Sequence, residues 1–130
     1  MSEVFEVQVQ TGSVTPIFRQ IVDQISVAVA RGALTCGDPL PSVRGLAERL
    51  VVNPNTVAKA YAELLRDGVI ESHQGKGVFV ARHRQVYTKA EKLRRLAPAL
   101  EAMVNQAVGL GLSAADIRDC VARKLDDMGL

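Results

Sequence analysis

The segment from Leu40 to Val80 constrains the fold more than any other part of the chain. It reads LPSVRGLAERL, continues with VNPNTVAKAY after one residue, and closes with QGKGVFV. The first two pieces predict a short helix, a tight turn and a second helix with a polar leading end. The last piece predicts a β-hairpin, because its glycines permit the positive φ values of tight hairpin turns. Together these parts predict a helix-turn-helix with a hairpin beside it.

Size and composition limit the class of protein. The 130 residues give room for one domain and a small appendage, and 48% hydrophobic with only 4% aromatic residues suits helices packed on aliphatic side chains. No apolar run approaches the ~18 residues of a membrane span, so we expect no membrane partner. The first residues lack the basic and apolar regions of a signal peptide. We therefore expect a cytoplasmic protein in which Cys36 and Cys120 stay unpaired.

Charge alone gives weak support for a polyanionic partner. The chain carries 16 Lys and Arg against 14 Asp and Glu, and its isoelectric point is about 8.7. Between residues 14 and 84 there are nine basic and six acidic side chains. The isoelectric point stays below the ~9 that is typical of nucleic-acid-binding domains. The interpretation therefore depends on where the charges fall.

The N-terminal part predicts an arm, a helix and a turn. Residues 4–9 alternate only in part between apolar and polar side chains, which suits a short strand or an extended arm. Thr15 and Pro16 have the pattern of a helix cap followed by the first helical residue, and Gly32 is typical of a helix end. The apolar stripe of this helix consists of Ile17, Ile21, Val22, Ile25 and Val29. Residues 37–41 contain two prolines and a glycine and are predicted to form a turn.

The central part predicts two capped helices and the hairpin. Ser42 is the expected cap of the first helix, whose inward side chains are Val43, Leu46, Ala47 and Leu50. Asn53 and Pro54 begin the second helix, which ends at Gly68 and has the apolar face Val57, Ala60, Tyr61, Leu64 and Leu65. Strands are expected at residues 69–72 and 78–81, with a loop between them.

The C-terminal part predicts a pair of helices after a polar link at residues 82–85. Thr88 with Glu91, and Ser113 with Asp116, have the spacing of capping boxes, and Leu112 with Ile117 has that of a hydrophobic staple. The first helix carries an apolar stripe across Pro98, where we expect a kink or two abutting helices. Two helices with no third partner cannot enclose a core, so they are expected to form a dimer. The predicted dimerisation residues are Leu93, Leu96, Leu100, Val104, Ile117, Val121 and Leu125.

The fold class that follows is mostly α with a small β-hairpin wing. A winged helix-turn-helix domain is expected over residues 1–84, with a short N-terminal strand or arm, three helices and the wing. A helical dimerisation tail is expected over residues 85–130.

Polar side chains on the second helix of the helix-turn-helix face away from its apolar stripe. Asn can form paired hydrogen bonds with adenine, Thr can contact a base or a thymine methyl group, and Lys can reach a phosphate or guanine. Glycine at the hairpin tip lets the backbone approach a phosphate, and lysine there supplies charge. These features predict binding to double-stranded DNA. The expected DNA-binding residues are Ser42, Arg44, Asn53, Asn55, Thr56, Lys59, Gln74, Gly75 and Lys76.

With these residues in view, the chain resembles the winged-helix domain of the GntR family of bacterial transcription regulators. The resemblance covers about half the chain and rests on an ordered set that includes PIF at 16–18, LPSVR at 40–44, VNPNTV at 52–57 and GKGVFV at 75–80. It implies that Arg44, Asn53, Asn55, Thr56, Gln74, Gly75 and Lys76 face operator DNA. Relatives often carry Arg where this chain has Ala58, so Lys59 is expected to replace part of that contact.

The short tail after the wing is similar to that of the YtrA subfamily. This likeness implies a homodimer, and often a repressor of transporter operons. A twofold dimer would place two recognition helices roughly 34 Å apart, which predicts a palindromic operator. The sequence leaves open whether a small-molecule effector binds.

Two other classes of function fit the sequence less well. An enzyme is disfavoured because Gly75 and Lys76 lack the surroundings of a phosphate loop, and because His73 and His83 have no partner at metal-ligand spacing. We therefore expect no catalytic residues, no metal and no cofactor. The alternative that stays open is a winged-helix scaffold that binds protein without specific DNA binding. Single-stranded nucleic acid is a poor fit, since few aromatic side chains are available for stacking.

Overall fold

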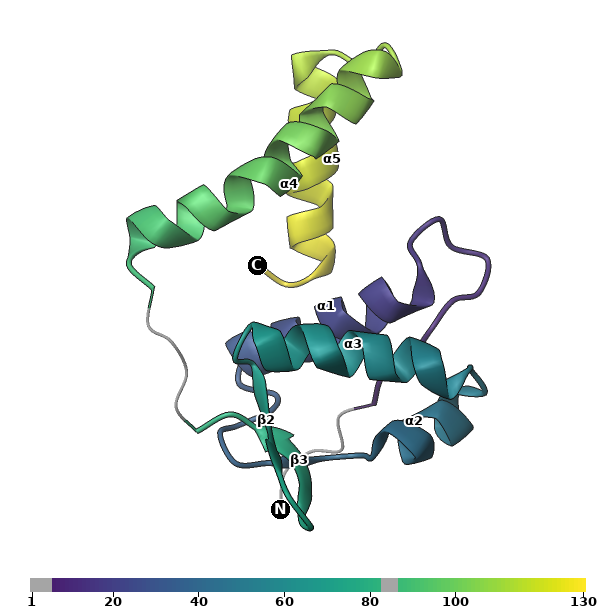
Figure 1. Cartoon of the computed structure of the whole chain (residues 1–130). Coiled ribbons are helices and arrows are strands. Elements are labelled where there is room, and N and C mark those ends of the chain that lie inside the picture. The colour runs from purple at the N-terminus through teal and green to yellow at the C-terminus, as the bar shows by residue number, and fades with distance from the viewer. Residues whose placement is uncertain (1–5, 83–86) are drawn as a thin grey trace. The chain divides into compact units, whose positions relative to one another are not determined.

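The computed structural model describes residues 6–82 and 87–130, which contain five helices and a three-stranded sheet (Figure 1). The elements in chain order are α1 (Ile17–Ala30), β1 (Pro39–Leu40), α2 (Val43–Leu50), α3 (Pro54–Arg66), β2 (Ile70–His73), β3 (Gly77–Val80), α4 (Lys89–Gly109) and α5 (Ala114–Asp127). They divide into two compact units, residues 1–85 and residues 86–130. The elements confirm a mostly α fold with a small hairpin wing.

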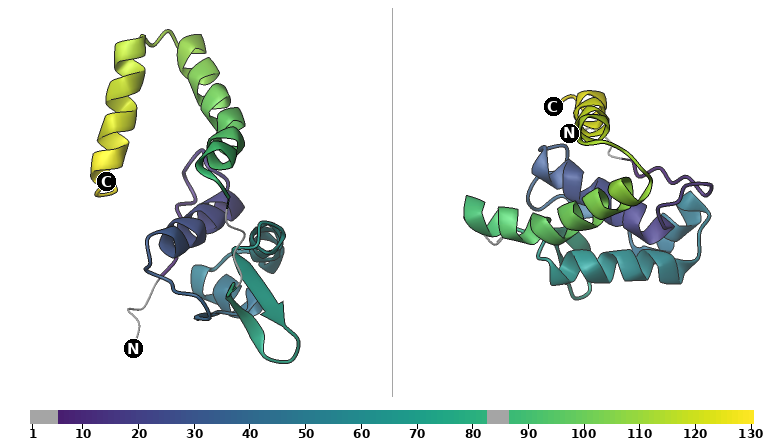
Figure 2. Two further views of the ribbon diagram at one scale, coloured as in Figure 1. Left: turned by 90° about the vertical axis from the view of Figure 1, so that its left-hand side faces the viewer. Right: turned by 90° about the horizontal axis from the view of Figure 1, so that it is seen from above.

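The core of the first unit lies where α1, α2 and α3 meet the sheet. Helix α3 packs against α1, α2 and β2, and α1 runs beside α3 in both views of Figure 2. Ile21, Ile25, Val57, Leu64 and Ile70 are almost completely buried there. Most of the predicted apolar stripes therefore point inward. Leu65 was predicted on the inward face of α3 but is 40% exposed, because it lies at the edge of the stripe.

The N-terminal arm is attached to α1 by side-chain amides rather than by strand pairing. Residues 6–10 form no strand, and the rest of the predicted strand lies outside the described residues. The Gln24 side chain accepts a hydrogen bond from the Gln8 amide at 2.9 Å and donates one to the Gln8 carbonyl at 2.6 Å. Gln20 forms the same pair of bonds with Gln10. These amides satisfy backbone groups that a neighbouring strand would otherwise satisfy.

The start of α1 differs from the prediction. Thr15 is not its cap: the helix begins at Ile17, and Pro16 occupies the cap position without a side-chain hydrogen bond. The Thr15 carbonyl instead accepts a hydrogen bond from Gln20 Nε2 at 2.8 Å. At the other end, Arg31 is the C-cap and Gly32 follows with φ of +82°, as expected of a glycine stop.

Residues 37–41, predicted to be only a turn, include a short strand. Pro39 and Leu40 form β1, which pairs antiparallel with β3 so that the strand order is β1-β3-β2. A proline is tolerated because β1 is an edge strand, where the missing N–H removes no essential bond. Around it, the Gly37 amide donates to the Val80 carbonyl and the Val80 amide donates to the Asp38 carbonyl, at 2.9 and 2.8 Å.

The second unit is a pair of helices joined by a turn at residues 110–113. Helix α4 continues through Pro98 as one helix, rather than as two abutting ones. Ser113 and Asp116 form the predicted capping box. At the other predicted capping box, the Thr88 side chain accepts a hydrogen bond from the Glu91 amide, but the two reciprocal bonds of a capping box are not both present. The helices diverge from their turn (Figure 2).

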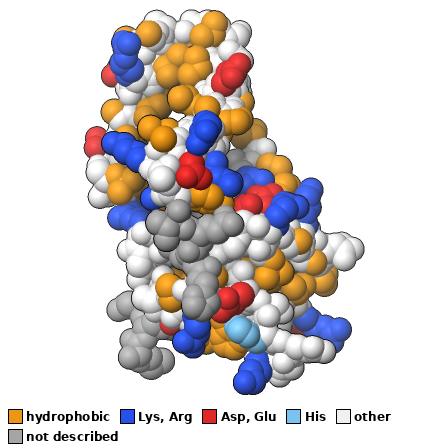
Figure 3. Space-filling view, turned by 60° about the vertical axis from the view of Figure 1, so that its left-hand side comes forward, with side chains coloured by type: hydrophobic (Ala, Val, Ile, Leu, Met, Phe, Trp, Pro, Cys, Tyr) orange, Lys and Arg blue, Asp and Glu red, His pale blue; other side chains and the backbone are white. Residues whose placement is uncertain are grey.

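The apolar stripes of this unit are largely exposed within one chain. Leu93, Leu96 and Leu100 are 57%, 55% and 51% exposed, and among the described residues of α4 and α5 only Ala107 is buried. Hydrophobic side chains accordingly stand at the surface of this unit beside basic ones (Figure 3). Val121 and Leu125, which belong to the predicted dimerisation residues, are 39% and 42% exposed. The single chain does not bury this face.

Candidate nucleic-acid interface

The polar start of α3 is exposed, and each helix of the helix-turn-helix begins at a side-chain cap. Ser42 Oγ accepts a hydrogen bond from the Gly45 amide at 2.9 Å, and Asn53 Oδ1 accepts one from the Asn55 amide at 2.8 Å. Both caps confirm the sequence prediction. Capping uses the Asn53 side-chain oxygen, so its NH₂ group and the whole Asn55 side-chain amide are the parts that can meet a ligand.

The turn between α2 and α3 contains a strained residue. Val51 is the C-cap of α2 and has φ of 56° and ψ of 51°, the left-handed region that branched side chains avoid. Its side chain is 88% exposed, so no packing contact offsets the energetic cost of this conformation. The conformation lets the chain reverse within three residues and begin α3 at Pro54.

A buried tyrosine connects α3 to the start of α2. Tyr61 is 2% exposed, and its hydroxyl donates a hydrogen bond to the Pro41 carbonyl at 2.7 Å. Burial raises the pKa of Tyr61 to about 12, although the positive charge of Arg49 acts in the opposite direction. Because Pro41 directly precedes the Ser42 cap, this bond sets how the two helices of the motif meet.

The wing presents its tip to solvent. Strands β2 and β3 pair from Ile70 with Val80 to His73 with Gly77, one residue beyond the predicted strand end. The Lys76 amide donates to the His73 carbonyl at 2.9 Å, and Gly75 has φ of +77°, a backbone conformation that favours glycine. Gln74, Gly75 and Lys76 are all exposed, as expected for groups that contact a partner.

The side of the wing carries a basic hollow that sequence reasoning missed. It has a volume of about 200 Å³ and is lined by His73, Lys76, Phe79 and Arg82. The rings of His73 and Phe79 meet edge to face at 5.3 Å, and His73 Nε2 lies 3.1 Å from Glu71 Oε1. The strand register brings these residues together, whereas the sequence pattern predicted His73 in the loop.

Lys59 occupies a different environment from the one predicted. It lies on the exposed side of α3, but its Nζ atom sits 3.9 Å from the centre of the Phe18 ring on α1. This is a cation–π contact, worth about 0.5–1 kcal/mol at exposed sites. The ammonium group must give up part of this contact before it can reach DNA. Asn55, by contrast, is exposed one turn earlier, and Thr56 is half-buried.

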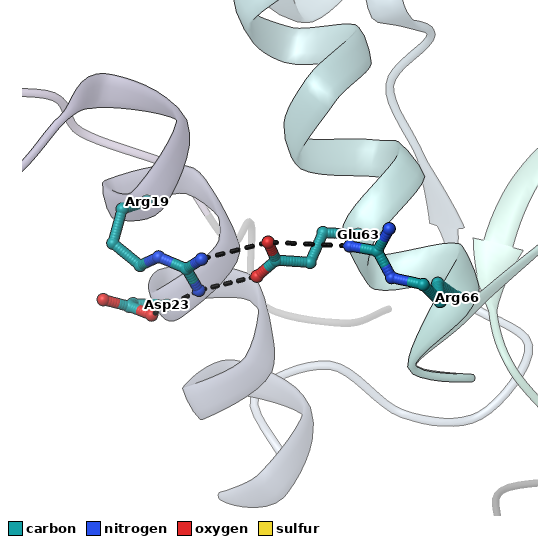
Figure 4. Close-up of polar contacts among 4 residues, drawn as sticks. All are labelled: Arg19, Asp23, Glu63 and Arg66. Carbon is teal, nitrogen blue, oxygen red and sulfur yellow. Dashed lines mark hydrogen bonds and ion pairs between the residues drawn. The ribbon is translucent and has the colours of Figure 1, made fainter. Parts of the chain in front are cut away.

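An ion-pair cluster attaches α3 to α1 behind the same surface (Figure 4). Arg19 meets both carboxylate oxygens of Glu63, at 2.6 and 3.0 Å, and Arg66 approaches Glu63 at 3.8 Å. Asp23 lies 3.9 Å from Arg19. Partial burial is the main reason that the pKa of Asp23 is raised; the positive charge of Arg19 acts in the opposite direction, and Glu63 adds to the rise. The cluster neutralises Glu63, the acid on the rear part of α3, and holds the helix in place.

The described residues offer little for other chemistries. Within residues 6–82 and 87–130, no group of three His, Cys, Asp or Glu side chains could hold a metal ion. His83 lies outside the described residues. None of the described helices is both long and apolar enough to cross a membrane. Cys36 and Cys120 are exposed free cysteines.

Comparisons with known proteins identify the family. Residues 18–80 match the bacterial regulatory proteins of the gntR family. The transcriptional repressor YtrA of Bacillus subtilis is 33% identical over 115 residues, which cover 88% of each chain. The chain therefore belongs to the GntR family of bacterial regulatory proteins, and its YtrA-like character is confirmed.

Two solved structures extend the likeness. The crystal structure of a transcriptional antiterminator from Listeria monocytogenes is 35% identical, has a TM-score of 0.77, and aligns over 98% of this chain and 93% of its own. The AraR DNA-binding domain in complex with operator ORX1 is 28% identical with a TM-score of 0.52, and the match covers 61% of this chain and 99% of that domain.

Proposed function

We propose that this GntR-family transcription regulator is a homodimeric repressor that binds a palindromic DNA operator through the start of α3 and the tip of the wing. The observation that carries the proposal is the exposure of Asn55 next to the intact Asn53 cap. An amide held at the start of a rigid helix can form paired hydrogen bonds with adenine in the major groove. The related AraR domain is seen on operator DNA. The proposal includes no catalysis and assigns no small-molecule effector.

The proposed contacts divide into base-reading and phosphate-binding groups. Asn55 and Arg44 are exposed near the starts of α3 and α2, and are the candidates for base edges. Lys76 and the Gly75 backbone at the wing tip are the candidates for phosphates. Ser42 and Asn53 are occupied partly as caps, so their remaining donors can supply phosphate contacts. Gln74, Thr56 and Lys59 complete the proposed surface.

The dimer is proposed to form through the apolar stripes of α4 and α5. Leu93, Leu96, Leu100, Val121 and Leu125 are all exposed in one chain, and Val104 and Ile117 are half-buried. Burying one leucine side chain contributes about 1.5–3 kcal/mol, so these stripes on both protomers supply ample stabilisation. The proposed domain division at residue 84 keeps the DNA-binding and dimerising parts separate.

The DNA-binding proposal is tested by selecting fragments of the source genome with purified protein and measuring binding to the recovered operator. Asn55→Ala or Arg44→Ala should weaken operator binding by roughly 1–3 kcal/mol and relax sequence preference. Lys76→Ala should weaken binding to all duplexes and lower the salt slope by about one. Failure to recover any preferred fragment, with weak binding that ignores salt and sequence, would support the protein-binding scaffold instead.

The dimer is tested by sedimentation of Leu100→Asp against Asn105→Asp. Asn105 is exposed on the same helix but lies off the apolar stripe, so both variants add the same charge to α4. Leu100→Asp should give monomers at concentrations where Asn105→Asp stays dimeric. If both variants sediment like the wild type, the tail does not form the dimer.

A further inference from the structure

The first two turns of α4 carry an uncompensated positive charge. Lys89, Lys92, Arg94 and Arg95, here called the basic start of α4, are all exposed and are accompanied by one acid, Glu91. In the part of the chain that the structure describes, none of the four forms an ion pair. Glu91 is engaged by Thr88, whose hydroxyl lies 3.2 Å from Glu91 Oε1. One carboxylate cannot balance the four cations of this stretch.

This charge is placed against the preference of the helix itself. The start of a helix favours acidic side chains, and a cation in its first turn, such as Lys89, costs about 0.3–1 kcal/mol. The rest of the chain carries 12 basic and 13 acidic side chains, so the net positive charge of the whole protein comes from this stretch. A sequence that keeps such a locally unfavourable arrangement is typically serving a partner.

The proposed dimer does not use these side chains. Arg94 and Arg95 follow Leu93 on the helix and point to either side, away from the stripe that continues at Leu96 and Leu100. Arg95 rests on the Tyr87 ring, with its guanidinium carbon 3.9 Å from the ring centre. The pairing of an arginine with a ring leaves the hydrogen-bond donors at the edge of the guanidinium available for phosphate oxygens.

We propose that the basic start of α4 binds backbone phosphates of duplex DNA next to the operator half-site, and so lengthens the contact beyond the winged helix. This inference rests on the proposed operator binding. Eight residues separate Val80, at the end of the wing, from Lys89. Fully extended, this link spans on the order of 30 Å, which is less than one turn of DNA at roughly 34 Å. This reach from the base of the wing lets these cations contact phosphates that flank the bound half-site.

The test compares a triple variant with a matched control on two lengths of DNA. In Lys92→Gln/Arg94→Gln/Arg95→Gln the basic start of α4 loses three charges. In Arg118→Gln/Arg123→Gln/Lys124→Gln, α5 loses the same number from exposed positions. The full-length proteins are titrated at several salt concentrations onto the selected operator trimmed to its palindrome, and onto the same operator with one further helical turn of DNA on each side.

The proposal expects weaker binding only for the α4 variant on the longer duplex. Its affinity there should fall at least tenfold, and its salt slope should fall by about 0.9 for each phosphate that the variant no longer neutralises. On the trimmed operator, the α4 variant and the control should bind equally. The α4 variant should also melt close to the wild type, because Lys89 is kept and only the contact of Arg95 with Tyr87 is lost. A misfolded variant would instead melt well below the wild type.

Three results would overturn the inference. The first is equal binding by wild type and α4 variant on the longer duplex, and the second is an equally large decrease in the α5 control, which would show a general charge effect. The third is that the wild type binds vesicles containing one third phosphatidylserine, whereas the α4 variant does not, and that both proteins bind DNA equally. A basic helix with a leucine stripe also suits anionic membranes. If the wild type binds neither duplex, the proposed function itself fails.

Discussion

Replacing Tyr61 with Phe should destabilise the helix-turn-helix without creating a cavity. The substitution removes only the hydroxyl that donates to the Pro41 carbonyl at 2.7 Å. That carbonyl would be left without its partner beside a side chain that is 2% exposed. Loss of a buried partner costs about 1–3 kcal/mol. For a domain of this size, each kcal/mol lowers the melting temperature by about 4–8 °C, so a fall of at least ~4 °C is expected near neutral pH.

The same hydroxyl should make stability depend on pH in the alkaline range. The pKa of Tyr61 is raised to about 12 in the fold, mainly by burial, and is about 10 in an unfolded chain. The stability gained by keeping the phenol neutral is complete below pH ~10 and is lost as the pH rises toward ~12. This contribution is on the order of 2 kcal/mol. Tyr61→Phe lacks it, so the difference in stability between wild type and variant should shrink across that range.

Denaturant unfolding at a series of pH values, with absorbance of the ionised phenol followed in parallel, measures both effects. The wild type should show one tyrosine that ionises late, and the variant should lack it. A Tyr61→Phe protein that melts no lower than the wild type near neutral pH, and loses stability just as steeply in the alkaline range, would refute the role given to this hydrogen bond. Tyr87→Phe serves as the control for removal of a hydroxyl outside the winged helix.

Three further changes test local features. Val51→Asn should raise the free energy of unfolding by about 1 kcal/mol in denaturant titrations. The left-handed conformation costs a branched residue ~1–2 kcal/mol, whereas Asn tolerates it. An unchanged or lower free energy of unfolding would show that the strain is absent. Asn53→Ala should lower it by about 1 kcal/mol through loss of the α3 cap, whereas Asn53→Ser should restore most of the loss. Hydrogen bonds from Ser113 lower the pKa of Asp116, so its stabilisation is present above the ordinary Asp range and lost as pH falls through the lowered pKa; far-UV circular dichroism should show a weaker acid dependence of helicity in Asp116→Asn, and equal profiles would contradict the capping role.

The parts of the fold that could be predicted are those that depend on neighbours in sequence. Helix caps act within three residues, so Ser42, Asn53 and Ser113 were identified correctly. Apolar periodicity likewise located the buried faces of the helices. Apart from the Thr15 cap and the incomplete capping box at Thr88, the misses involve groups far apart in the chain. Strand β1 exists because Pro39 meets Phe79, and no local pattern around two prolines indicates a strand.

In the candidate site, too, local features could be predicted and contacts between distant residues could not. Helical spacing placed Lys59 on the outer side of α3 correctly. It could not reveal that the ammonium group of Lys59 contacts the ring of Phe18, 41 positions earlier in the chain. The bidentate contact of Arg19 with Glu63 was missed for the same reason. Both contacts run from α1 to α3. The surface proposed to bind DNA therefore depends on a helix that is not itself proposed to touch it.

The tail sets the limit of what a periodic pattern can say. A leucine stripe indicates that one face of a helix needs to be covered, but it does not identify the chain that covers it. In α4 and α5 the structure separates these statements: the stripes are present, and Leu93, Leu96 and Leu100 each remain more than half exposed in the single chain. A helix pair with almost no buried side chain has too little packing to be stable alone. The stability of this unit should therefore depend on protein concentration. A dimer that buries the stripes would also fix the spacing of the two DNA-binding units.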